Sequence, residues 1–215
     1  MNIFHNERYV WVLPERTGSR SLGQILNFWD GQRYIGDELI DLGKYKNYEG
    51  EFTQVYSHEW QLKNPDLKDY TFCVTVRNPY SRMLSYYKSL WLKLDCRDEK
   101  CQYTFKEFME LGMIEGKYIW HLNFENLFDL VDVKYVIHME NIANDLISVP
   151  MIREKYDNSD EFREEWTRVI INNIFTKESA DNFTKLTEED AEIVYNSFER
   201  QFKLFGYSED SWRYL

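Results

Sequence analysis

Apolar residues are concentrated in four short segments, at residues 9–13, 52–56, 70–76 and 133–139. Each segment has the length of a strand and is rich in β-branched or aromatic residues, so each predicts a strand, and the first of them a buried one. The segment at 70–76, Tyr-Thr-Phe-Cys-Val-Thr-Val, is apolar on both faces. That pattern is typical of a central strand in a parallel sheet.

Between these segments, apolar residues recur with the spacing of one helix face. The pattern predicts one helix capped by Ser19 or Ser21, one that begins at Pro79 and one that begins after Thr187. It predicts further helices at residues 103–111, 141–149 and 159–174. Residues 31–51 have the composition of a surface connection, and residues 119–130 have an ambiguous pattern. Because strands alternate with helices, we expect a single α/β domain over residues 1–215. It would have three layers, with a mostly parallel central sheet of about four to five strands flanked by helices.

The first strand stops at Pro14 and leads into a turn with the chemistry of an anion site. Gly18 permits a tight turn or a positive φ, and a helix follows. The unpaired amides and the macrodipole of a helix start attract anions. The candidate ligands in this turn are Arg16, Thr17, Gly18, Ser19, Arg20 and Ser21. The ordinary P-loop pattern, G-x-x-x-x-G-K-[ST], is absent, and a plain strand–turn–helix with solvated arginines is the alternative interpretation.

A second anion site is predicted where the 70–76 strand ends. Arg77 ends the strand, Asn78 is suited to cap the next helix and Pro79 to begin it. Ser85 lies near enough to the helix start to share a ligand with Arg77, for which a strand-end salt bridge is the alternative role. Ligands of α/β sheets bind at the carboxyl ends of the strands. Two anion sites at such ends favour a ligand with two anionic groups, such as a nucleotide phosphorylated at both ends of its ribose.

His58 follows the 52–56 strand at the same predicted edge. An ordinary histidine pKa of about 6.5 suits a general base near neutral pH. Glu59 is the alternative base, and His58 as an ordinary loop histidine is the other interpretation. We expect structural roles for His121 and His138, although His121 could also line an acceptor pocket. No histidine and glutamate cluster has the spacing of metal ligands, so we expect no metal.

Net charge and the length of the apolar runs argue against several classes of function. The 215 residues carry a formal charge of −11, which argues against binding to nucleic acid or to an anionic membrane surface. No apolar run reaches the length of a membrane span, and the N-terminus lacks a signal-peptide pattern. We therefore expect a cytoplasmic protein without a membrane span. Cys73 is expected to be a buried thiol, and Cys96 and Cys101 to stay reduced in that compartment.

Four segments resemble the family of PAPS-dependent sulfotransferases, in particular its carbohydrate and membrane-type branch. Arg-Thr-Gly-Ser-Arg-Ser-Leu (16–22) looks like its 5′-phosphosulfate loop, P-K-T-G-G-T-S-L. Arg-Asn-Pro-Tyr-Ser-Arg-Met-Leu-Ser-Tyr-Tyr (77–87) looks like its 3′-phosphate motif, R-[ND]-P-x-x-R-x-x-S-x-Y. Glu-Asn-Ile-Ala-Asn-Asp (140–145) is similar to its E-N-[LI]-x-x-D segment. The helix ending Phe-Lys-Leu-Phe-Gly-Tyr (202–207) resembles its closing helix, Y-x-x-D-F-x-x-F-G-Y.

The first segment departs from the family pattern. Arg16 stands where a lysine that contacts the moving sulfonate is usual, Glu15 is inserted after Pro14, and Arg20 stands where threonine or serine is common. His58, in Tyr-Ser-His-Glu, resembles the catalytic histidine of enzymes similar to uronyl 2-O-sulfotransferase. That likeness favours His58 over Glu59 as the base.

The resemblance implies a P-loop-like nucleotide-binding fold that transfers a sulfonate from PAPS to an acceptor hydroxyl and releases PAP. It assigns the 5′-phosphate and the sulfonate to Arg16 and its loop, and the 3′-phosphate to Arg77 and Ser85. His58 would take the acceptor proton without a metal. The late loop would cap the nucleotide through Lys177 and Ser179, and the acceptor would lie near Glu59 and His121. Relatives from the secretory pathway carry a signal or a stalk, so the resemblance also implies a bacterial or viral enzyme or, as the alternative, a shortened chain.

The sequence is compatible with more than one acceptor and with more than one activity. An aromatic content of 17 % favours a glycan, while a tyrosine or a small metabolite is also compatible with the sequence. A nucleotide kinase with a degenerate loop would use ATP and Mg²⁺ in place of PAPS. A non-catalytic module would bind PAP or another nucleotide without turnover.

Overall fold

The computed structural model describes residues 2–4, 7–14, 16–27, 67, 69–93, 103–115, 124–129, 131–174 and 185–215. The chain divides into two compact units. The sheet unit comprises Met1–Val76 and Asn126–Ser179, and the helical unit comprises Arg77–Glu125 and Ala180–Leu215. That residues 1–215 form a single domain therefore stays a prediction.

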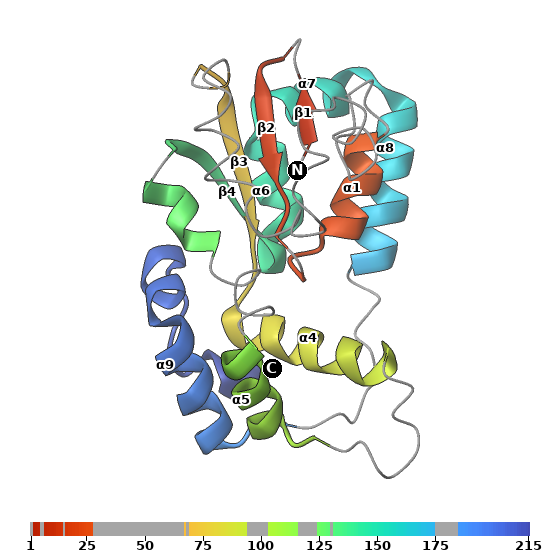
Figure 1. Ribbon diagram of the computed structural model, residues 1–215. Helices are drawn as coiled ribbons and strands as arrows, with labels where there is room; N and C mark the ends of the chain where they lie inside the picture. The colour runs from red at the N-terminus through yellow and green to blue at the C-terminus, as the bar shows by residue number, and fades with distance from the viewer. Residues whose placement is uncertain are drawn as a thin grey trace. The chain divides into compact units, whose positions relative to one another are not determined.

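The sheet unit is built around a four-stranded sheet with the order β1-β2-β3-β4 (Figure 1). The strands are β1 (Asn2–Phe4), β2 (Tyr9–Val12), β3 (Thr71–Val76) and β4 (Val133–His138). β2 pairs in parallel with β3, and β3 pairs in parallel with β4. The predicted α/β class, with a mostly parallel sheet, is confirmed for the described residues. The strand predicted at 52–56 lies outside them.

β1 is an edge strand that the apolar pattern does not predict. It pairs antiparallel with β2, so that Phe4 lies opposite Tyr9. Three residues are too few to show a strand period, and the strand begins with the polar Asn2. The side chain of Phe4 is nevertheless buried in the core.

β3 is buried on both faces, as predicted for a central strand. Cys73 lies opposite Trp11 on β2 and Tyr135 on β4, and these residues belong to one hydrophobic cluster. Val74 and Val76, on the other face of β3, are fully buried as well. Burial raises the pKa of the Cys73 thiol, in keeping with the buried thiol predicted there.

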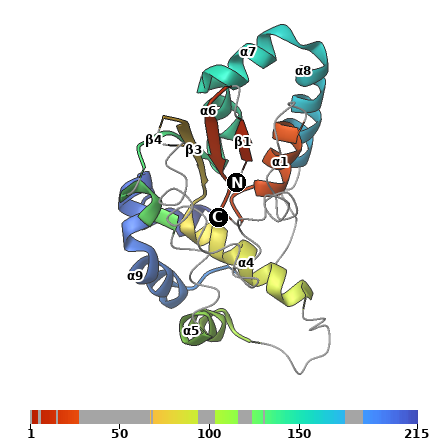
Figure 2. The same cartoon turned by 45° about the horizontal axis from the view of Figure 1, so that its top comes forward.

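Helices of the sheet unit contribute to the cluster that contains Cys73. They are α1 (Ser19–Asn27), α6 (Ile142–Ser148), α7 (Pro150–Asn158), α8 (Asp160–Trp166) and the π-helix η4 (Thr167–Ile174). α6 lies next to β4, and α1 and α8 run side by side (Figures 1 and 2). The sequence predicts Pro150 as the end of a helix but not as the first residue of α7. Proline suits that position because the first helical N–H has no partner within the helix.

The helical unit contains α4 (Pro79–Lys93), α5 (Phe105–Glu115), α9 (Glu188–Phe205) and the 3₁₀ helix η5 (Ser211–Tyr214). α9 begins with the predicted capping box. The Thr187 hydroxyl accepts from the Asp190 N–H at 3.1 Å, and the Asp190 carboxylate accepts from the Thr187 N–H at 3.0 Å. α9 ends at Gly206, whose φ of 72° is left-handed, as predicted. Aromatic rings from all three α-helices make up much of the core of this unit: Tyr80, Tyr86, Tyr87, Phe105, Phe108, Phe198 and Phe202.

Candidate functional site

The loop between β2 and α1 has two left-handed residues, Arg16 with a φ of 64° and Gly18 with a φ of 74°. The Leu22 N–H donates to the Gly18 carbonyl at 3.0 Å, and Ser19 is the first residue of α1. The residue whose carbonyl accepts the first helical hydrogen bond is the N-cap. The prediction of Ser19 or Ser21 as the cap is therefore wrong, because Gly18 takes that position.

Gly18 is required for its backbone angle and for its packing. A Cβ built on Gly18 would lie 2.3 Å from Sδ and 2.4 Å from Cε of Met139, the residue that follows β4. Such distances are far below a van der Waals contact. The glycine therefore lets the loop after β2 approach the end of β4 closely.

Thr17 joins the same loop to β3. Its hydroxyl donates to the Pro14 carbonyl at 2.6 Å and lies 2.7 Å from the Thr75 hydroxyl. Both threonines are fully buried. These bonds stay within the protein, so the Thr17 side chain shapes the loop, and its predicted contact with an anion stays a prediction.

The end of β4 is held by Asp145 on α6. The Asp145 carboxylate accepts from the His138 N–H at 2.7 Å and lies 3.0 Å from Nδ1 of the His138 ring. Its other oxygen accepts from the Asn141 side chain at 2.6 Å. These contacts agree with the structural role expected of His138. The loop after β2 is thus linked to β3 through Thr17 and lies close to the end of β4 at Gly18.

The start of α4, in the helical unit, carries the second predicted anion site. Asn78 caps the helix as predicted, because its Oδ1 accepts from the Tyr80 N–H at 3.0 Å. The Asn78 Nδ2 also donates to the Ser211 hydroxyl at 2.8 Å. Arg77 and Ser85, the predicted ligands, are both half-buried.

Two further side chains fix α4 against the C-terminal part of the chain. The Tyr80 hydroxyl donates to the Glu209 carbonyl at 2.6 Å, and burial, followed by the nearby Glu209 charge, raises the pKa of Tyr80 to about 12. Arg82, the second arginine of the 77–87 motif, is buried and donates to Gln201 Oε1 on α9 at 3.1 Å. The sequence pattern predicts no role for Arg82 or Gln201, since only the fold shows that they meet.

Other predicted residues fall where the structure does not describe them. The predicted residues outside the described part of the chain are His58, Glu59, His121, Lys177, Ser179, Cys96 and Cys101. Arg20 and Ser21 belong to the first turn of α1, and only their backbone is described. The Arg16 loop and the Arg77 helix start belong to different units. Their joint binding of one ligand therefore stays a prediction.

The described geometry suits an anion at the start of α1. Helix geometry leaves the first N–H groups without partners inside the helix, and the macrodipole adds positive potential there. A comparison with protein families matches residues 3–208 to the family described as Sulfotransferase family. The chain belongs to the sulfotransferase family. It is thus a transferase of sulfonate groups, which implies a sulfonate donor such as PAPS and an acceptor substrate.

The remaining comparisons add no relative. The search of the curated proteins and the search of the solved structures found no match for this sulfotransferase. In the described part of the chain, no helix is long and apolar enough to cross a membrane. Among the same residues, no group of three or more His, Cys, Asp or Glu side chains could hold a metal ion.

Proposed function

We propose that this sulfotransferase moves a sulfonate from PAPS to an acceptor hydroxyl, and that the acceptor is a glycan. Family membership supports sulfonate transfer in general. The observation that supports PAPS most directly is the loop between Arg16 and Gly18. Its left-handed backbone at Arg16 and Gly18 leads directly into the start of α1, and such a turn into a helix start suits a phosphate or sulfonate.

Each end of the nucleotide has a proposed partner. Arg16 and the first amides of α1 bind the 5′-phosphate and the sulfonate, with the polar loop residues predicted from the sequence completing the cradle. Arg77 and Ser85 bind the 3′-phosphate at the start of α4, and the late loop with Lys177 and Ser179 covers the nucleotide. An arginine suits both ends, because charge-assisted hydrogen bonds to phosphate are strong.

The transfer itself needs little covalent chemistry from the protein. As the acceptor oxygen attacks the sulfur, the bond from sulfur to the 5′-phosphate oxygen breaks, and PAP leaves with that oxygen. His58 takes the acceptor proton, and Arg16 stabilises the charge on the sulfonate oxygens. Positioning and electrostatic stabilisation of this kind account for most of the catalysis in the related transfer of phosphoryl groups.

A labelled-sulfonate assay with His58→Ala tests the assignment of the base. We expect the variant to lose transfer to a glycan panel and to keep PAP binding in calorimetry. His138→Gln is the matched control, because that histidine is held by Asp145 and is assigned a structural role. Unchanged transfer in His58→Ala would remove His58 as the base, and lost transfer in His138→Gln alone would give that role to His138.

Thermal shift separates this function from its two rivals. A ligand that binds only the folded state raises the melting temperature. We expect stabilisation by PAP and none by ATP with Mg²⁺, whereas a nucleotide kinase would show the reverse. Bound PAP without label transfer to any glycan, peptide or small hydroxyl compound would favour a non-catalytic module.

A further inference from the structure

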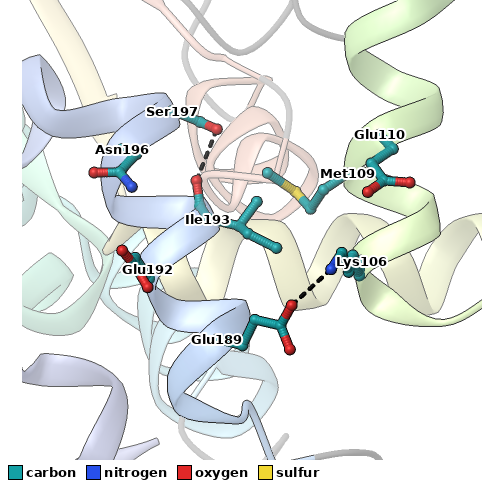
Figure 3. A pocket seen from close by; sticks show the side chains of 8 residues that line it. All are labelled: Lys106, Met109, Glu110, Glu189, Glu192, Ile193, Asn196 and Ser197. Carbon is teal, nitrogen blue, oxygen red and sulfur yellow. Dashed lines mark hydrogen bonds and ion pairs between the residues drawn. The ribbon is translucent and has the colours of Figure 1, made fainter.

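An open groove of about 590 Å³ lies between α5 and α9 in the helical unit (Figure 3). Its two apolar lining residues are Met109 from α5, which is buried, and Ile193 from α9, which is half-buried. Both side chains belong to or pack against the core cluster beneath, so the helices that form the groove are held firmly. None of the residues predicted to bind the nucleotide lines this groove.

Charged side chains border the apolar surface. Figure 3 shows Lys106 on α5 pointing toward Glu189 on α9, while Glu110 on α5 and Glu192 on α9 are the other charged lining residues. Lys106 and Glu189 form an ion pair at 2.6 Å across the groove. The hydrogen bond and then the charge of Glu189 raise the pKa of Lys106, and Glu110 raises it further.

The groove as a whole is therefore acidic. One positive and three negative side chains give it a net charge of −2. The single lysine is already paired with one of the three carboxylates. Glu189, Glu192 and Ile193 follow one another at helical spacing on α9, as Lys106, Met109 and Glu110 do on α5. Each wall thus combines one apolar side chain with carboxylates, one on α5 and two on α9.

We propose that this groove binds a basic polypeptide segment in which lysine or arginine residues neighbour an apolar side chain. Charge complementarity selects the basic residues, which meet the carboxylates of Glu110 and Glu192. The apolar side chain packs on the half-buried Ile193, next to the buried Met109. The open groove suits several side chains of one segment better than a single small ion. This docking surface does not depend on the sulfonate donor or on the acceptor.

The test uses the full chain and a short fluorescein-labelled peptide of repeated Lys-Leu-Gly-Ser units. Fluorescence anisotropy measures its affinity, and methyl NMR of Met109 and Ile193 locates its site. We expect saturable binding that shifts both methyl signals and weakens with salt. The double variant Glu110→Gln/Glu192→Gln should bind the peptide about threefold to tenfold more weakly, the range expected for two exposed ion pairs.

A matched variant controls for overall charge. Glu154→Gln/Glu164→Gln removes two exposed carboxylates from α7 and α8 in the sheet unit and should keep wild-type affinity. Equal weakening in both double variants would overturn the proposal, since the peptide would then sense only the acidic surface. Unshifted Met109 and Ile193 signals would also overturn it, as would equal binding of a peptide with glutamate in place of lysine. Spermine that shifts these signals with the affinity of the peptide would assign the groove to small polycations instead.

Discussion

Gly18→Ala perturbs the loop at the point where it passes closest to the end of β4. The variant adds one methyl group to a residue whose φ is 74°. That methyl group would lie 2.3 Å from Sδ of Met139. The substitution therefore destabilises the folded state in two ways, through the left-handed backbone of residue 18 and through the close contact with Met139.

The two costs can be estimated separately. A left-handed backbone costs an alanine about 1–2 kcal/mol relative to glycine. Overpacking by one methyl group costs about 1–3 kcal/mol, and the lower end applies here because Met139 can move its flexible end. We expect Gly18→Ala to lower the free energy of unfolding by about 2–4 kcal/mol, a large part of the stability of an ordinary domain.

Alanine substitutions at two other glycines show the effect of the backbone alone, without a steric contact. A Cβ on Gly206, whose φ is 72°, meets nothing within 4 Å, so Gly206→Ala carries the backbone cost alone, about 1–2 kcal/mol. A Cβ on Gly23, inside α1, also meets nothing within 4 Å. Gly23→Ala should stabilise the protein by about 0.5–1 kcal/mol, because alanine favours a helix.

Urea unfolding followed by circular dichroism measures all three variants. Met139→Ala provides a double-mutant cycle, in which Gly18→Ala should cost less because the contact with Sδ is gone. An unfolding free energy within 0.5 kcal/mol of wild type for Gly18→Ala would refute the left-handed loop. An equal cost of Gly18→Ala with and without Met139 would refute the close approach to the end of β4.

Three further predictions concern the nucleotide, the loop and pH. Arg77→Ala should weaken PAP binding in calorimetry by more than about tenfold and leave adenosine 5′-phosphate unaffected; wild-type PAP affinity would contradict the 3′-phosphate site. Thr17→Val removes the buried hydroxyl that contacts Thr75 and should lower the unfolding free energy by about 1–3 kcal/mol in urea; an unchanged midpoint would contradict that bond. The hydrogen bond and charge of Lys106 lower the pKa of Glu189, so their stabilisation is present above the unfolded pKa of glutamate and is lost as pH falls through the lowered value. NMR titration should show the pKa of Glu189 returning toward its ordinary value in Lys106→Gln, and an unchanged pKa would contradict the pair.

The helix caps show which features can be predicted from residues that lie close together in the sequence. Asn78 and Thr187 were predictable as helix caps, because a cap acts through residues two or three positions away. The cap of α1 was not, since serine and glycine can both take that position and the choice depends on the backbone of the whole loop. At Gly18 the close approach of Met139 excludes a side chain, and this contact spans a long stretch of sequence.

The sequence by itself determined the α/β class, the strands β2, β3 and β4, the helix starts at Pro79 and Thr187, and the resemblance to the family that the comparison confirms. These features follow from apolar periodicity, from capping chemistry and from short motifs, all of which act within a few residues. Only the tertiary structure decided that Thr17 bonds to Thr75 and that Arg82 bonds to Gln201. It also formed the acidic groove between α5 and α9, because packing joins residues whose separation along the chain carries no local signal.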